Sequence, residues 1–301
     1  MTLEQLKYLQ AIVEHGSFRA AAESVFRSQS SLSISIKKLE HELDVQLFER
    51  KTYRPTLTIA GKAIYKKAQV ILSKSHELKS LAEHLARGHE AELRLAISGV
   101  LPIEPIIDIL NQINTTYPET RMTMLIESLG GTMERLLDDD ADIALTDSFE
   151  SSSNLEGILL TEIPFVSVLS SRSKWVNKIT SLTEQDLENE TLIVVRDTSH
   201  HSTRISKGIL EGAPQWVVND FSTKQRIIRS GKGWGRMPYH LVKDDIKSGQ
   251  LMMLNSHDFG TFQAPIHLVR KKNKTAGSVA ESLWQALQAI AWINPTNKPL
   301  V

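Results

Sequence analysis

The alternation of apolar and polar positions predicts three short helices at the start of the chain. The first begins at the capping-box pair Thr2 and Gln5, ends at Gly16 and has an apolar stripe of Leu3, Leu6, Leu9 and Val13. The second follows Ser17, a suitable N-cap, and its apolar face consists of Phe18, Ala21, Ala22 and Val25. The third follows Ser28 and buries Leu32, Ile36 and Leu39. A tight turn joins the last two helices, and the first helix backs them.

The outward face of the third predicted helix is small, polar and basic. At about 100° per residue, five residues lie opposite the buried stripe or beside that position, namely Gln29, Ser30, Ser33, Ile34 and Lys37. A helix with a narrow inward stripe and such an outward face fits the major groove of DNA. The same periodicity also fits an ordinary helical hairpin in a globular core, so the pattern alone leaves both interpretations open.

A basic loop follows these helices. Val45, Leu47 and Phe48 are expected to close a small core, and the stretch 50–56 carries the cations Arg50, Lys51 and Arg54. Basic side chains in such a loop bind phosphates or enter a minor groove, which positions a protein on DNA more than it specifies a sequence. The loop is therefore a candidate wing, and a solvated basic loop is the alternative.

A long helix without Gly or Pro is predicted from Lys62 to about Arg87, with Thr58 as a cap before it. Its apolar residues recur in steps of four and three, with Ser75 in the one gap, and are Ile64, Ala68, Ile71, Leu78, Ala82 and Leu85. Steps of this kind form a heptad seam, and a long helix with one apolar side needs a partner. The seam therefore predicts dimerisation, with packing against the chain's own C-terminal part as the alternative.

From Ala91 onward the pattern changes to short apolar strands that alternate with amphipathic helices. Strands are predicted at 93–97, 122–126, 143–145, 165–169, 192–195, 216–218, 234–237, 251–254 and 266–270. Helices are predicted at 102–114, 131–137, after Ser202, at 223–230 and at 276–292. Such alternation implies a mostly parallel sheet flanked by helices.

Many residues of the N-terminal part match a known family in order and in spacing. They are Ser17-Phe18, Ala21-Ala22-Glu23, Ser28-Gln29, Ser33, Ile36, Leu39-Glu40, Leu47-Phe48-Glu49-Arg50 and Leu57-Thr58-x-Ala60-Gly61. This series resembles the winged helix-turn-helix of LysR-type transcriptional regulators. The family often has Pro, Arg and Gln where this chain has Ser30, Ile34 and Ser35. Because Ile34 can meet a thymine methyl but cannot bind guanine in a bidentate manner, the family's usual half-site is not carried over.

The second part of the chain resembles the effector domain of the same family. The clearest matches are Tyr117-Pro118, Leu137 with Asp142-Ile143-Ala144, Gly231-x-Gly233 with Pro238, and Gly249-x-Leu251. The resemblance implies an α+β multidomain protein with a winged helix-turn-helix at 1–57, a linker and dimerisation helix with a hinge at 58–90, and a two-lobed α/β effector domain at 91–301. The effector domain is expected to resemble periplasmic binding proteins, with lobe I at about 91–162 and 266–301 and lobe II at about 163–265.

The same resemblance implies the partners of the protein. They are double-stranded DNA, a small-molecule effector bound between the lobes, and a second copy of the chain in a homodimer. In the family two dimers usually form a homotetramer through linker helices and effector domains. RNA polymerase is a further candidate partner.

Ligands of open parallel sheets bind beyond the carboxyl ends of the strands, where helix N-termini offer amide groups. Such places supply the candidate effector-binding residues, which are Ser98, Gly99, Val100, Leu101, Ser128, Thr132, Thr146, Ser199, His200 and Thr223. The family places its inducer near the positions that match Ser98, Thr132, Ser199 and Thr223. Each residue taken alone is better explained as an ordinary cap, and only the collective position favours a cleft.

The adjacent His200 and His201 raise the question of a metal site. Neighbouring helical residues point about 100° apart, and no Cys or paired-His motif supports these two, so no metal is expected. With Arg196 and Arg204 nearby, the two histidines would instead favour an anionic effector. The chain shows no Walker motif, nucleophile elbow or paired catalytic acids, so neither a cofactor nor an enzyme activity is expected.

Composition narrows the class further. A length of 301 residues suggests two or three domains, and the absence of cysteine excludes disulfides and thiolate chemistry. No apolar run is long enough to span a membrane, and charges interrupt the N-terminal stretch, so we expect a cytoplasmic protein without a signal peptide. Residues 1–90 carry 14 Lys and Arg against 10 Asp and Glu, although the whole chain has zero net charge. A basic first part suits a nucleic-acid module.

We therefore expect a sequence-specific DNA-binding transcriptional regulator that is modulated by a small-molecule effector. A solute-binding receptor with a fused helical module and no specific DNA recognition is the alternative, and the missing signal sequence counts against it. An α/β enzyme is a second rival, which needs a catalytic constellation that the sequence does not show. Within the favoured class, a cleft closed to small molecules with constitutive DNA binding is a further alternative.

Overall fold

The computed structural model describes residues 1–49, 54–200, 212–273, 276–290 and 292. The chain divides into two compact units, Met1–Arg87 and Gly88–Val301. Arg50 and Lys51 of the expected wing, and the helix expected after Ser202, lie outside the described residues. Within the described part of the chain, no helix is long and apolar enough to cross a membrane.

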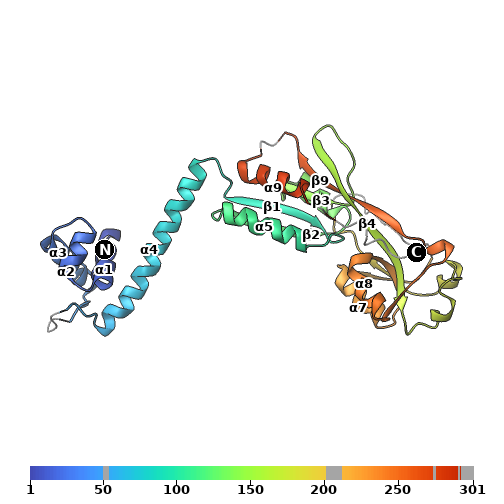
Figure 1. Cartoon of the computed structure of the whole chain (residues 1–301), viewed down its shortest axis with the longest axis horizontal. Coiled ribbons are helices and arrows are strands. Elements are labelled where there is room, and N and C mark those ends of the chain that lie inside the picture. Colours follow the sequence, from blue (N-terminus) through green and yellow to red (C-terminus); the bar gives the residue numbers. More distant parts are fainter. Residues whose placement is uncertain (50–53, 201–211, 274–275, 291, 293–301) are drawn as a thin grey trace. The chain divides into compact units, whose positions relative to one another are not determined.

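The described helices of the first unit begin where their capping residues predict. They are α1 (Leu3–His15), α2 (Phe18–Ser24), α3 (Gln29–Leu43) and α4 (Ile59–Ala86), all visible in Figure 1. In each helix the expected cap accepts a hydrogen bond from a backbone N–H of the first turn, and these caps are Thr2, Ser17, Ser28 and Thr58. Gly16 ends α1 in the left-handed conformation. The caps expected from the sequence are thus confirmed.

The core of this unit lies where α1 packs against α2, α3 and α4. Its buried side chains include Leu6, Leu9, Ile12, Ala21, Ala22, Leu32, Ile36, Leu39, Leu47 and Phe48. Leu3 was expected in this stripe but is exposed, and Ile12 continues the buried face of α1 instead. The helix α4 starts at Ile59, earlier than expected, and runs through Gly61. A Cβ at Gly61 would lie 2.1 Å from the carbonyl oxygen of Leu47, so glycine allows this close approach.

The predicted heptad seam of α4 has two parts with different surroundings. Ala68 is 2% exposed and lies in the core of the unit, and Ile64 packs against the same core. The prediction that the whole seam faces a second subunit is therefore corrected at these two positions, because the chain's own helices cover them. The rest of the seam is exposed and consists of Ile71, Leu78, Ala82 and Leu85.

One sheet runs through the described part of the second unit. Its strands are β1 (Glu92–Ser98), β2 (Arg121–Glu127), β3 (Ile143–Thr146), β4 (Leu155–Ser170), β5 (Leu192–Val195), β6 (Gln215–Val218), β7 (Trp234–Pro238), β8 (Leu251–Met253) and β9 (Phe262–Lys271). The order is β2-β1-β3-β9-β4-β7-β5-β6, and β8 pairs with β4. Strand β1 is parallel to β2 and β3, and β5 is parallel to β6 and β7, whereas β4 and β9 are antiparallel to their neighbours. The expectation of a mostly parallel sheet therefore holds at each end of the sheet but not in its middle, where β4 and β9 are antiparallel to their neighbours.

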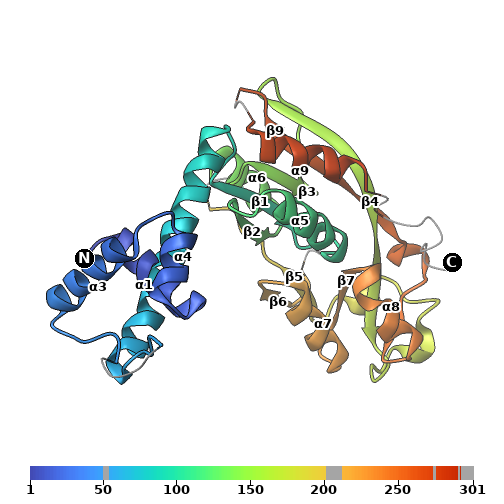
Figure 2. The ribbon, with the colours of Figure 1, turned by 60° about the vertical axis from the view of Figure 1, so that its left-hand side comes forward.

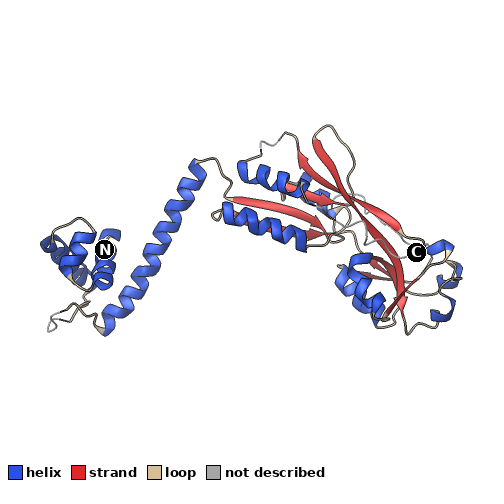
Figure 3. Cartoon of the chain, viewed as in Figure 1, coloured by secondary structure: helices blue, strands red, loops and turns tan. Residues whose placement is uncertain are grey.

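Helices cover the sheet at both ends (Figure 2, Figure 3). Strands β1–β3 with α5 (Glu104–Thr116), α6 (Gly131–Leu137) and α9 (Ser278–Gln288) form lobe I, and strands β5–β8 with α7 (Phe221–Arg229) and α8 (Tyr239–Lys247) form lobe II. Short 3-10 helices at Val176–Lys178, Gln185–Leu187 and His257–Phe259 complete lobe II. In lobe I the side chains of Leu95 and Leu145 face the core shared with α5 and α9, while Ala96 and Ala144 face α6.

Strand β4 and helix α8 differ most from the sequence-based expectation. Strand β4 extends from Leu155 to Ser170, although only 165–169 was expected, because pairing with β9 carries it past Gly157 and Pro164. Helix α8 was not expected at all, since it is short and follows Pro238 without a capping side chain. The remaining strands match their expected positions to within a few residues.

The two lobes are joined by a neck of two strands. Residues 161–164 of β4 pair with residues 263–266 of β9, and among the described residues no third strand flanks these four pairs. A register shift between Leu159 and Thr161 lies at the end of the neck that is nearer to lobe I. Such an irregularity bends a strand and increases its twist.

Candidate functional site

Helix α3 presents the predicted DNA-facing side chains at its surface. Gln29, Ser30 and Lys37 are exposed, Ile34 is 66% exposed, and Ser33 is half-buried. On the opposite face, the buried residues Leu32, Ile36 and Leu39 hold the helix against the core. The structure thus brings these five positions onto one accessible face of a capped helix.

The base of the candidate wing is a short antiparallel pair. The backbone N–H of Glu49 donates to the carbonyl oxygen of Thr56 at 2.8 Å, and Phe48 and Leu57 form a bridge next to it. Arg54 is exposed, whereas Arg50 and Lys51 lie outside the described residues. The described part therefore has the hairpin base that a wing needs.

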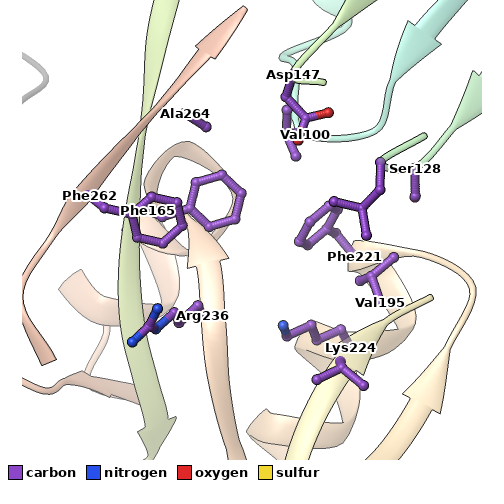
Figure 4. A pocket seen from close by; sticks show the side chains of 12 residues that line it. Val100, Ser128, Asp147, Phe165, Val195, Phe221, Lys224, Arg236, Phe262 and Ala264 are labelled. Atoms are coloured by element: carbon purple, nitrogen blue, oxygen red, sulfur yellow. The ribbon is translucent and has the colours of Figure 1, made fainter. Parts of the chain in front are cut away.

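A pocket lies where lobe I, lobe II and the neck meet (Figure 4). Its lining residues are Val100, Ser128, Leu129, Asp147, Phe165, Val194, Val195, Phe221, Lys224, Arg236, Phe262 and Ala264. The space between them, including the open mouth, is about 630 Å³. Mostly apolar walls with a few polar groups are typical of small-molecule sites.

Aromatic rings form the wall of this pocket on the neck side. Phe165 of β4 and Phe262 of β9 are cross-strand neighbours, and their rings stack with centroids 4.8 Å apart. Phe221, at the start of α7, meets Phe165 edge-on at 6.1 Å. Flat aromatic walls favour a flat or apolar body in the ligand.

The cationic end of the pocket contains Lys224 and Arg236. Lys224, in α7, is 5% exposed, and burial lowers its pKa from the usual 10.5 to about 7, with a smaller contribution from the charge of Arg236. Gly235 of β7 leaves room for this side chain, since a Cβ there would lie 2.7 Å from Lys224 Cε. Arg236 is half-buried on the same strand, and its Nε has no hydrogen-bond acceptor among the described residues.

The opposite end of the pocket carries a carboxylate. Asp147 follows β3 and is buried, and its Oδ1 accepts a hydrogen bond of 2.8 Å from the Ser98 hydroxyl at the end of β1. Figure 4 shows Asp147 at one end of the pocket, with Lys224 and Arg236 at the other. The site therefore has one acceptor end and one donor end.

Only part of the predicted effector-binding set lines this pocket. Val100 and Ser128 line it, and Ser98 reaches it through Asp147. Other members of the set are not among the lining residues, namely Gly99, Leu101, Thr132, Thr146, Ser199, His200 and Thr223. Thr223 is exposed, and its backbone N–H and hydroxyl both donate to Asp220, the N-cap of α7, so this side chain takes part in the capping of α7. Thr132 and Ser199 are buried with hydroxyls that have no hydrogen-bond partner among the described residues.

A second contact joins the lobes beside the pocket. The Thr198 hydroxyl, after β5, accepts from the Ser128 N–H at 3.0 Å and donates to the Ser128 carbonyl at 3.1 Å. A Cβ at Gly131 would lie 2.0 Å from that hydroxyl, so glycine permits the approach. The backbone N–H of His200 donates to the Glu134 carboxylate at 2.8 Å. We call these contacts the interlobe clasp.

Neither His200 nor Arg196 supplies positive charge to the pocket. His200 and Arg196 are exposed and do not line the pocket, while His201 and Arg204 lie outside the described residues. Across the described ranges, no group of three or more His, Cys, Asp or Glu side chains is placed to hold a metal ion. The cations in the pocket are instead Lys224 and Arg236, which the sequence-based set missed.

The missed residues carry no local signal. Lys224 lies on a helix with several other polar residues, where a lysine is ordinarily solvent-exposed, and Arg236 lies on a short strand. In the turn between α2 and α3, Phe26 is 93% exposed and has a φ of 55°. A bulky residue in the left-handed region is uncommon, and periodicity cannot reveal it.

Comparisons with known proteins agree in both parts of the chain. Residues 3–62 match the model of the bacterial regulatory helix-turn-helix protein, lysR family, and residues 86–291 match the model of the LysR substrate binding domain. The probable HTH-type transcriptional regulator YhaJ of Escherichia coli (strain K12) is 30% identical over 257 residues, which cover 85% of this chain and 86% of YhaJ.

Solved structures show the same fold. A mutant of OxyR from Corynebacterium glutamicum is similar with a TM-score of 0.56 at 21% identity, over 95% of this chain and 92% of that one. Full-length LysG from Corynebacterium glutamicum, solved with bound effector arginine, has a TM-score of 0.51 at 19% identity, over 96% and 97% of the two chains.

Proposed function

The chain belongs to the LysR family of bacterial transcriptional regulators, and from this we propose that α3 recognises a specific DNA sequence while the interlobe pocket binds the effector that modulates it. The protein is a DNA-binding regulator with an effector-binding domain, and it is not an enzyme. Since it acts on bacterial DNA, we place it in the cytoplasm. RNA polymerase is the further partner that we propose for a regulator of transcription.

The accessible face of α3 is the part that would enter the major groove. Gln29 and Ser33 offer hydrogen bonds to base edges, and Ile34 offers an apolar contact to a thymine methyl. Lys37 and Arg54 would bind phosphates and so position the helix without specifying bases. Binding should therefore weaken steeply as salt concentration rises.

The exposed half of the α4 seam supports a two-fold assembly. Leu78 is 69% exposed, and Ile71 and Leu85 lie on the same stripe. An apolar stripe of this kind on a long helix is stabilised when a second copy covers it. A homodimer would present two α3 helices to a two-fold DNA site with half-sites one helical turn, or a multiple, apart. A homotetramer would be a pair of such dimers.

The observation that carries the effector proposal is the pocket between the lobes. Its walls come from both lobes and from the neck, so a ligand that fills it contacts all three. A ligand shifts such an equilibrium only by its difference in affinity for the two arrangements. We propose that the resulting change in the effector domain alters how the subunits sit on DNA.

Selection of bound sequences from randomised duplex DNA tests the proposal. Full-length protein would be used at two salt concentrations, beside a variant with Gln29→Ala and Ser33→Ala and a control with His41→Ala at the far end of α3. We expect a two-fold motif for the wild type and for the control, and loss of the motif for the double variant. Enrichment of no motif at either salt concentration would contradict the proposal and favour a ligand receptor without DNA recognition.

A further inference from the structure

We propose that the effector is a small aromatic carboxylate whose charged group lies between Lys224 and Arg236. This inference rests on the proposed function, because it names the chemical class that the interlobe pocket accepts. The carboxylate would lie at Lys224 and Arg236, and the rest of the ligand would extend toward Asp147.

The first support is the surroundings of Lys224. The side chain is almost completely buried, and its ammonium group makes no ion pair or hydrogen bond with another described residue. Its nitrogen lies 5.8 Å from the centroid of the Phe221 ring, a contact that stabilises a cation only weakly at that distance. Buried charges in proteins are ordinarily paired. The partner of this ammonium group is therefore expected to enter from the pocket, toward which Figure 4 shows it pointing.

The second support is the presence of another cation at the same end. The Arg236 guanidinium lies 5.7 Å from the Phe262 ring centroid, and its Nε donor has no acceptor among the described residues. The charge of Arg236 disfavours the charged form of Lys224, so the two cations repel each other. One anion between them would relieve this repulsion and accept hydrogen bonds from both side chains. A carboxylate suits this role because guanidinium donors match its two oxygens.

The walls and the far end of the pocket indicate which other chemical groups the ligand carries. The stacked rings of Phe165 and Phe262, with Phe221 edge-on to Phe165, favour a flat aromatic body. Asp147 at the far end repels a second carboxylate and accepts hydrogen bonds. A hydroxyl group on the ring, opposite the carboxylate, would donate to Asp147. The pocket thus favours one carboxylate and one orientation.

Matched probes of different charge test the inference on the full-length protein by titration calorimetry. Benzoate would be compared with benzamide, para-hydroxybenzoate with para-hydroxybenzamide, and both acids with the cation benzylamine. Lys224→Met and Arg236→Met remove one positive charge each, and Lys247→Met removes an exposed charge of the same lobe as a control. Circular dichroism would establish that each variant is folded.

We expect each carboxylate to bind at least about tenfold more tightly than its amide. The preference should disappear in Lys224→Met, decrease in Arg236→Met and persist in Lys247→Met, and benzylamine should not bind. Equal binding of acids and amides, no binding of either acid at millimolar concentration, or an unchanged preference in Lys224→Met would each overturn the inference.

The failure of this inference and that of the proposed function are distinguishable. A neutral or cationic compound that occupies the pocket and changes DNA binding would overturn the carboxylate class while leaving the regulator with its interlobe effector site. Carboxylate binding that depends on Lys224, in a protein that selects no DNA motif, would do the reverse.

Discussion

Replacement of Lys224 by methionine should stabilise the second unit, and more so at low pH than at high pH. The substitution keeps a long, unbranched side chain but removes an ammonium group that burial disfavours. In the folded protein the pKa of this group falls from 10.5 to about 7, whereas the unfolded chain keeps the ordinary value. Between these two values the unfolded state binds more protons than the folded state, so the stability of the wild type rises with pH there. Below about pH 7 the full cost of burying the charge is present.

The magnitude follows from the two pKa values. At roughly 1.4 kcal/mol per pH unit, the shift corresponds to at most about 5 kcal/mol near pH 6, of which about 2 kcal/mol remains near pH 9. Lys224→Met should therefore be more stable than the wild type by a margin that shrinks by about half over this range. Asp147 at the other end of the pocket and Arg236 beside Lys224 are present in both proteins. The difference between the two proteins therefore isolates Lys224.

Urea unfolding followed by tryptophan fluorescence measures this margin in the second unit alone. All tryptophans of the chain lie there, at Trp175, Trp216, Trp234, Trp284 and Trp292. The control Lys247→Met changes an exposed lysine and should shift the free energy of unfolding by less than about 0.5 kcal/mol at either pH. Equal stability of Lys224→Met and wild type near pH 6, or a margin that stays constant up to about pH 9, would refute the reasoning.

Three further substitutions test other parts of the molecule. Ile34→Arg adds a bidentate donor to the exposed face of α3, so sequence selection should show a change of base preference larger than the change in overall affinity; equal losses on all sequences would contradict it. Leu78→Glu places a charge in the exposed seam of α4 and should convert dimers to monomers in sedimentation, whereas Lys79→Ala should not; an unchanged mass would count against the seam. Thr198→Val removes the two hydroxyl hydrogen bonds to Ser128, so it should lower the free energy of unfolding by about 1–3 kcal/mol and speed hydrogen exchange of the Ser128 amide. Unchanged exchange would show that the interlobe clasp does not depend on these two bonds.

The elements of the first unit could be predicted because their signals are local. Ser17, Ser28 and Thr58 each lie within a few residues of the backbone groups that they cap, and the stripe of α3 repeats within one helix. The seam of α4 was predicted only in part, since periodicity shows that a stripe is apolar but not what covers it. Ala68 meets the core of its own unit, and Leu78 does not.

The pocket was harder to predict because its parts are distant in sequence. The order of strands and helices predicted the region in which the pocket lies, and two of the predicted residues, Val100 and Ser128, line it. Lys224 was missed because a lysine on a short polar helix is ordinarily a surface residue, and only the packing of α7 on β7 buries it beside Arg236. Thr223, its neighbour in sequence, was chosen instead, although its hydroxyl is exposed and donates to Asp220, the N-cap of α7.

The neck gives the ligand a mechanical role as well as a chemical one. Phe165, Phe262 and Ala264 belong at once to the pocket wall and to the two strands that connect the lobes. A flat molecule held against these side chains would contact both strands of the neck. It would therefore restrain changes in the twist of these strands. We therefore expect a rigid ligand to change DNA binding more than a flexible ligand of equal affinity does.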